Sequence, residues 1–214
     1  MWQYTGVIII ILIFVIGIPV ALYMNKKRIR ALENFANSLG FEYSDLPDIS
    51  LIKRWNLPLF SLGKKNIFNM LTKENDGVKI TLVDYQYRVG GSQNGKTYAQ
   101  TVLIYESKLL NLPSFTLSHE NILHKMGSVL GHKDINFDNF PKFSSQYQLN
   151  GKDEDKIREL FNSDKLNFFE QRKKINIEAD KNIFIYYRVR KFVAVKDMKI
   201  FLNEGQRIFN LLKS

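Results

Sequence analysis

The segment with the most definite chemical pattern is GGSQNGKT, from Gly90 to Thr97. Its Gly90, Gly95, Lys96 and Thr97 match the phosphate-binding pattern G-x-x-x-x-G-K-[ST]. In a working site of this kind the loop follows a buried strand and opens a helix, whose first backbone amides hold the phosphates. The residues after Thr97, YAQTVLIY, predict a strand instead. We therefore expect a hairpin loop here, with nucleotide binding by this loop as the alternative.

The three histidines, His119, His124 and His132, are the candidates for a metal site. Zinc needs three or four converging ligands, often at i,i+4 spacing on a helix. His119 and His124 are five residues apart, so this segment lacks the H-E-x-x-H pattern, and on a helix the two side chains would point about 140° apart. The sequence predicts no metal site and no bound cofactor.

Carboxylates for acid–base catalysis could come from Glu120, Asp134 and Asp138, but no spacing links these three residues. The chain has no cysteine, and none of its serines lies in a nucleophile-elbow pattern. We name no catalytic residue, and favour a protein without enzymatic activity.

Aromatic and basic residues alternate from Phe184 to Phe192, in the sequence FIYYRVRKF. A stacking platform for single-stranded nucleic acid has this composition, and so does a strand with one core face and one basic face. We favour the strand. Nucleic-acid binding stays as a third option, and it predicts strongly salt-dependent retention of DNA or RNA.

The pattern of helices and strands that must position these residues predicts an α+β fold, in which helices pack on a mainly antiparallel sheet. Residues 78–88 and 98–106 are expected to form a hairpin around the glycine-rich loop. The hydrophobic periodicity predicts further strands at 115–117, 143–149, 175–179 and 183–189. It also predicts helices after the N-cap Ser118, from Asp153, around 166–169, and at 196–212.

An apolar stretch of 19 residues, from Gly6 to Met24, carries no charge. As a helix it would cover about the 30 Å of a bilayer's hydrocarbon core, which predicts a transmembrane helix. Lys26, Lys27 and two arginines follow it, so the positive-inside rule places the C-terminal part in the cytoplasm and the N-terminus outside. We therefore expect a single-pass membrane protein with its C-terminal part in the cytoplasm.

Three regions follow from this pattern: a transmembrane anchor at 1–25, a juxtamembrane helix at 26–40, and a cytoplasmic α+β domain at 41–214. Gly40 is well placed to cap the second region. The net charge is +10, and four of the 31 basic residues belong to the flank of the apolar stretch. The remaining 27 exceed the 21 acidic residues by six, which suits an anionic lipid surface and is weak evidence for nucleic acid.

Several short motifs follow one another along the chain in a recognisable order. They include Leu39-Gly40-Phe41, Val83-Asp84-Tyr85-x-Tyr87, Pro113-x-Phe115-x-Leu117, Phe143-Ser144-x-x-Tyr147-x-Leu149-x-Gly151 and Tyr186-Tyr187-Arg188. In this order the chain resembles an uncharacterised family of bacterial single-pass membrane proteins with a cytoplasmic α+β domain. The resemblance covers almost the whole chain and concerns the fold. It implies no activity or ligand.

The sequence thus predicts a non-enzymatic interaction domain, held at the inner membrane and contacting a protein partner or an anionic lipid surface. The alternative function is nucleotide binding by the loop from Gly90 to Thr97.

Overall fold

The computed structural model describes residues 13–91, 94–119 and 134–213. Within these ranges the chain forms one antiparallel sheet of eight strands, in the order β1-β2-β3-β4-β8-β7-β5-β6. The strands are β1 (Glu42–Ser44), β2 (Lys64–Asn75), β3 (Val78–Val89), β4 (Lys96–Ser107), β5 (Leu112–His119), β6 (Tyr147–Gly151), β7 (Asn176–Lys181) and β8 (Ile183–Tyr187). The α-helices are α2 (Ile18–Leu39), α3 (Pro58–Ser61), α5 (Pro141–Gln146), α6 (Glu154–Leu160), α7 (Ser163–Glu170) and α8 (Met198–Leu212).

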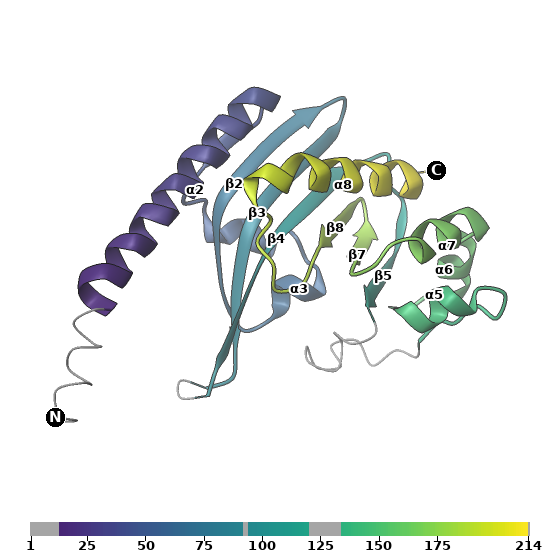
Figure 1. Cartoon of the computed structure of the whole chain (residues 1–214). Helices are drawn as coiled ribbons and strands as arrows, with labels where there is room; N and C mark the ends of the chain where they lie inside the picture. Colours follow the sequence, from purple (N-terminus) through teal and green to yellow (C-terminus); the bar gives the residue numbers. More distant parts are fainter. Residues whose placement is uncertain (1–12, 92–93, 120–133, 214) are drawn as a thin grey trace.

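The sheet separates two hydrophobic cores, because successive side chains of a strand point to opposite faces. Strand β4 contributes Leu103 and Tyr105 to the larger core, and Val102 and Ile104 to the smaller one. Helices α2 and α8 and the group α5–α7 cover the larger core (Figure 1). A 3-10 turn (Ile49–Lys53) and the short α3 cover the smaller one. Burial on both faces explains the unbroken apolar run in β4.

Helix α8 packs closely on the middle of the sheet. Its Gly205 lies where an added Cβ would come within 2.2 Å of a Leu103 methyl group, so a side chain at this position would push the helix outward. On either side of the glycine, Phe209 stacks on Tyr105 at 5.2 Å between ring centroids, and Phe201 stacks on Tyr186 at 4.6 Å. Close helix approach and ring stacking together fix the position of α8.

The predicted α+β sheet and its central hairpin agree with the structure. Strands β3 and β4 pair in register from Val78 opposite Ser107 to Val89 opposite Lys96. The predicted helix from Asp153 is also present, since the Asp153 carboxylate accepts a hydrogen bond from the Lys156 N–H.

Two local predictions differ from the structure, and one strand was not predicted. Residues 143–146 belong to helix α5 and not to a strand, and the strand begins only at Tyr147. Ser118 lies in strand β5, and the helix predicted to follow it falls outside the described residues. The sequence pattern also did not predict β2, whose alternation is interrupted by a register shift between Phe68 and Leu71.

The predicted transmembrane helix is contradicted. Throughout the part of the chain that the structure describes, no helix combines the length and apolar character needed to cross a membrane. Gly6 to Leu12 of the expected span lie outside the described residues. From Ile18, α2 runs through the predicted boundary at residue 25 without a break, so the apolar residues and the cluster from Lys26 to Arg30 share one helix. The absence of a membrane-spanning helix among the described residues also overturns the predicted single-pass, inner-membrane location.

An ion pair between α2 and the sheet shows what the basic cluster does in the fold. The Arg28 guanidinium contacts the carboxylate of Asp84 on β3, at 2.8 Å between Nη2 and Oδ2 and 3.1 Å between Nε and Oδ2. Asp84 is 1% exposed, and it also accepts hydrogen bonds from Asn69 Nδ2 at 3.0 Å and Thr101 Oγ1 at 2.6 Å. The sequence assigned Arg28 to a membrane flank, whereas here it docks α2 on the sheet.

We predict that Arg28→Ala lowers the free energy of unfolding by about 3 kcal/mol, because it leaves the buried Asp84 carboxylate without its cation. Arg30→Ala is the matched control, since Arg30 is exposed two residues further along the same helix. Urea unfolding followed by circular dichroism measures both changes. Equal losses in the two variants would show that the ion pair does not hold α2.

Candidate functional site

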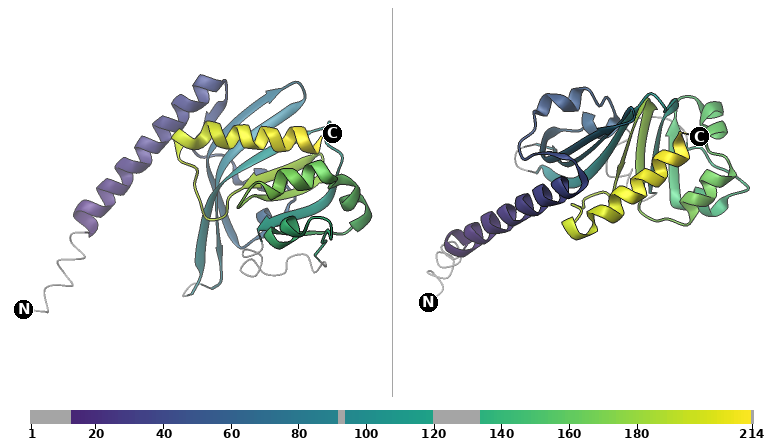
Figure 2. Two further views of the ribbon diagram at one scale, coloured as in Figure 1. Left: turned by 45° about the vertical axis from the view of Figure 1, so that its right-hand side comes forward. Right: turned by 90° about the horizontal axis from the view of Figure 1, so that it is seen from above.

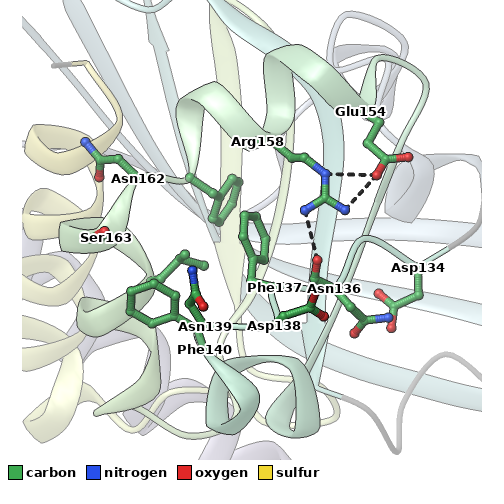
Figure 3. A pocket seen from close by; sticks show the side chains of 12 residues that line it. Asp134, Asn136, Phe137, Asp138, Asn139, Phe140, Glu154, Arg158, Asn162 and Ser163 are labelled. Atoms are coloured by element: carbon green, nitrogen blue, oxygen red, sulfur yellow. Dashed lines mark hydrogen bonds and ion pairs between the residues drawn. The ribbon is translucent and has the colours of Figure 1, made fainter.

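A hollow of about 580 Å³ lies beside the loop that leads into α5, against helices α6 and α7. Aromatic side chains and carboxylates line it together (Figure 3). Its residues are Asp134, Asn136, Phe137, Asp138, Asn139, Phe140, Glu154, Arg158, Phe161, Asn162, Ser163 and Leu166.

The arginine of this hollow is occupied by its neighbours. Arg158 donates from Nε and Nη2 to Glu154 Oε1, at 2.9 and 2.7 Å, and from Nη1 to the Asn136 carbonyl at 2.9 Å. Its guanidinium carbon also lies 5.1 Å from the centroid of the Phe137 ring. Arg158 therefore ties the loop to α6, as Figure 3 shows.

The acidic residues that the sequence raised for acid–base chemistry meet only in part. Asp134 and Asp138 both line the hollow, whereas Glu120 lies outside the described residues. The Asp134 carboxylate accepts a hydrogen bond from the Leu149 N–H at 2.9 Å and so attaches the loop to β6. This contact gives Asp134 a structural role.

The histidines offer no metal site in the ranges that the structure describes, where no group of three or more His, Cys, Asp or Glu side chains could hold an ion. His119 ends strand β5, with its ring centroid 6.4 Å from that of Tyr147. His124 and His132 lie outside those ranges.

The glycine-rich loop joins two antiparallel strands, and Lys96 begins β4. A phosphate-binding loop instead needs the N-terminus of a helix after the lysine, so its backbone-amide cradle is not formed at Lys96 and Thr97. Gly90 has a φ of 98°, a conformation that glycine adopts freely and that suits the hairpin.

A second hollow, of about 840 Å³, lies beside the start of β4. Its lining brings the lysine and threonine of the sequence motif together with two residues of the basic and aromatic stretch. The lining residues are Lys96, Thr97, Tyr98, Ala99, Arg190 and Phe192. The sequence did not link these two segments, because 90 residues separate them.

The stretch from Phe184 to Phe192 does not form a stacking platform. Phe184 and Tyr186 are buried in the larger core, and Tyr187 is buried in the smaller one. Of its rings, Phe192 alone is exposed, at 37%. This stretch therefore has no row of exposed aromatic rings on which nucleic-acid bases could stack.

A buried carboxylate that the sequence did not single out holds the cover of the smaller core. Glu178 of β7 accepts hydrogen bonds from the Leu59 N–H at 2.8 Å and the Tyr187 hydroxyl at 2.9 Å. The Tyr85 hydroxyl donates to the Leu59 carbonyl at 3.0 Å, so side chains of the sheet hold both polar groups of one α3 residue. In the sequence, Asn176 and Glu178 alternate with apolar residues, and this pattern was the signal that could have indicated a buried carboxylate.

Burial raises the pKa of the Glu178 carboxyl to about 7, and the two hydrogen bonds that it accepts lower the pKa in part. A shifted carboxyl of this kind can mark a functional site. Here its partners are a backbone amide of α3 and a buried tyrosine, which makes it a structural clamp.

An extensive apolar surface lies on the first half of α2 and on the π-helix before it (Ile13–Gly17). From Val15 to Met24 every residue is exposed, and the segment extends away from the sheet (Figures 1 and 2). Its large apolar side chains are Val15, Ile16, Ile18, Val20, Leu22, Tyr23 and Met24, each between 44% and 68% exposed.

Comparison with known proteins places the fold. No family model matches the chain, and no curated protein matches it. A crystal structure of the mycobacterial trehalose monomycolate transport factor A, TtfA, shares the fold with a TM-score of 0.62 at 14% identity. The similarity covers 87% of this chain and 92% of that one. At this identity the likeness concerns the fold alone.

We predict that the stability of the protein falls as pH rises from about 4.5 to about 7, because the folded state binds the Glu178 proton more tightly than the unfolded chain does. The slope is at most about 1.4 kcal/mol per pH unit. Glu178→Gln keeps an oxygen acceptor and removes the titration, so its unfolding free energy should lack this component.

Urea unfolding of the wild type and Glu178→Gln at about pH 5 and about pH 8 measures the difference. Glu159→Gln, at an exposed position on α6, is the matched control and should follow the wild type. The same pH dependence in the wild type and Glu178→Gln would assign the titration to another group.

Proposed function

We propose that this chain is a non-enzymatic interaction domain, which binds a partner protein through the exposed apolar residues from Val15 to Met24. The observation that supports it is the exposure of this segment, where Val15 is 65%, Leu22 57% and Met24 65% exposed. Scattered apolar side chains are common on protein surfaces, but a contiguous patch of this kind marks a contact surface.

The way α2 is held supports this role. It is attached to the domain by Arg28 at its middle and by the fully buried Leu32 and Ala36 in its second half. Its first half extends beyond the sheet without contact to the cores (Figure 2). The helix is therefore anchored at one end and presents the other to a partner.

The spacing of the exposed side chains suits a partner with an apolar groove. Ile18 and Leu22, at positions i and i+4 of α2, form one row of apolar side chains of the kind that a helix places in a groove. Val20 and Tyr23 form a second row at i and i+3. A protein groove that takes both rows would cover most of the exposed segment.

The shared fold supports the class of role. The protein of that crystal structure is a transport factor. We extend this class of role to the present chain and propose that it acts as an accessory factor, through contact with its partner and without chemistry of its own.

We predict that a photo-crosslinking residue at Val20 in cells forms an adduct with one defined protein. The same residue at Ile200, which is 66% exposed on α8, is the matched control and should not form this adduct. The additional change Leu22→Glu should abolish the adduct, because it places a charge in the apolar contact.

Direct binding to the purified adduct protein then tests the contact. We expect Leu22→Glu to weaken the affinity more than tenfold, as loss of a central apolar anchor does, and Ile200→Glu to leave it unchanged. Adducts with lipid alone, or equal adducts at Val20 and Ile200, would overturn the proposal.

A further inference from the structure

We propose that the hollow at the start of β4 binds a phosphorylated ligand through the side chains of Lys96 and Arg190. The site is separate from the apolar segment of α2, and the proposal does not depend on the partner protein.

The charges of the hollow favour an anion. Two of its six lining residues are cations, and none is a carboxylate. Both Lys96 and Arg190 are exposed, and within the described ranges neither forms an ion pair. The hollow therefore presents two positive charges to solvent with no internal counter-charge.

Arg190 is held in place by its neighbours. Its guanidinium carbon lies 4.6 Å from the centroid of the Tyr98 ring, and Tyr98 stacks on the buried Tyr87 at 5.2 Å. Its backbone N–H donates to Oε1 of the fully buried Gln100 at 3.1 Å. A guanidinium that rests with its face on a ring keeps its in-plane N–H groups for two oxygens of one anion.

The backbone of Arg190 has a conformation that non-glycine residues seldom adopt. Its φ is 59°, in the left-handed region. The next residue, Lys191, accepts a hydrogen bond at its carbonyl from the Thr101 N–H at 3.2 Å, so strand β4 fixes the segment on this side too. The guanidinium is thereby positioned before a ligand arrives.

Lys96 and Thr97 also line the hollow. They are paired across the hairpin with Val89 and Arg88, which fixes the start of β4. An ammonium group and a guanidinium together match the charge and the acceptor oxygens of a phosphate group, and Tyr98, on which Arg190 rests, shares the strand face of Lys96. These are side-chain donors on a strand, and the site differs in this from a phosphate-binding loop, which uses backbone amides.

The opposite side of the hollow is apolar and indicates the kind of phosphate. Ala99 and Phe192 belong to the lining, and the Phe192 ring packs edge-on against Phe68 at 5.7 Å. A phosphate that carries an apolar group can cover this ring, whereas inorganic phosphate cannot. We therefore expect an amphiphilic phosphate, as in a phospholipid headgroup, to bind more tightly than the free anion.

Calorimetric titration of the full chain tests this with three probes: inorganic phosphate, monomeric short-chain phosphatidylglycerol, and phosphatidylcholine of the same chain length. We expect phosphatidylglycerol to bind most tightly. Lys96→Gln and Arg190→Gln should each lower the affinity for this lipid about tenfold, which is the effect of losing one charge-assisted hydrogen bond. Phe192→Ala should lower the affinity for phosphatidylglycerol and leave the affinity for inorganic phosphate unchanged.

Lys108→Gln and Arg207→Gln are the matched controls, since both residues are exposed outside the hollow, and they should bind like the wild type. Inorganic phosphate binding as tightly as the lipid, with the same losses in the two hollow variants, would support a soluble phosphate as the ligand. The proposal is overturned if no probe binds, if Lys96→Gln and Arg190→Gln leave the affinity for phosphatidylglycerol unchanged, or if the controls lose affinity equally.

Discussion

The carboxylate of Asp84, buried in the third strand of the sheet, is the group on which the arrangement of the N-terminal helix depends. A buried charge is costly unless charged and neutral donors surround it. Arg28, Asn69 and Thr101 supply these donors from α2, β2 and β4. Meeting this one requirement fixes the helix on the sheet.

The same requirement shapes the backbone around it. Asn69 is 3% exposed and has a φ of 51°, at the register shift that interrupts β2. This irregularity places its amide beside Asp84. The Thr101 hydroxyl also accepts a hydrogen bond from the Val193 N–H at 2.9 Å, and Arg28 donates to the Val193 carbonyl at 2.9 Å. The segment that leads into α8 is thus attached to the same cluster.

A second buried carboxylate, Glu178, holds the cover on the opposite face. Its donors are neutral, a backbone amide and a tyrosine hydroxyl, whereas Asp84 has an arginine. Burial with neutral partners raises the pKa of Glu178 to about 7. On the first face, Arg28 also contacts Phe192, since its guanidinium carbon lies 5.5 Å from the centroid of the Phe192 ring. Phe192 lines the basic hollow, so the docking of α2 also supports one wall of that site.

By itself the sequence determined the elements whose signals are local. The alternation from Val78 onward and the glycine-rich loop defined the central hairpin, and Asp153 defined the start of α6. Gly40 does end α2, with a φ of 70°. The tertiary structure decided everything that joins distant residues: the partner of Arg28, the clamp on Leu59, and the hollow that unites Lys96 with Arg190. Hydrophobic periodicity reports which face of an element is buried, but a buried charge is paired by residues that only the folded chain brings together.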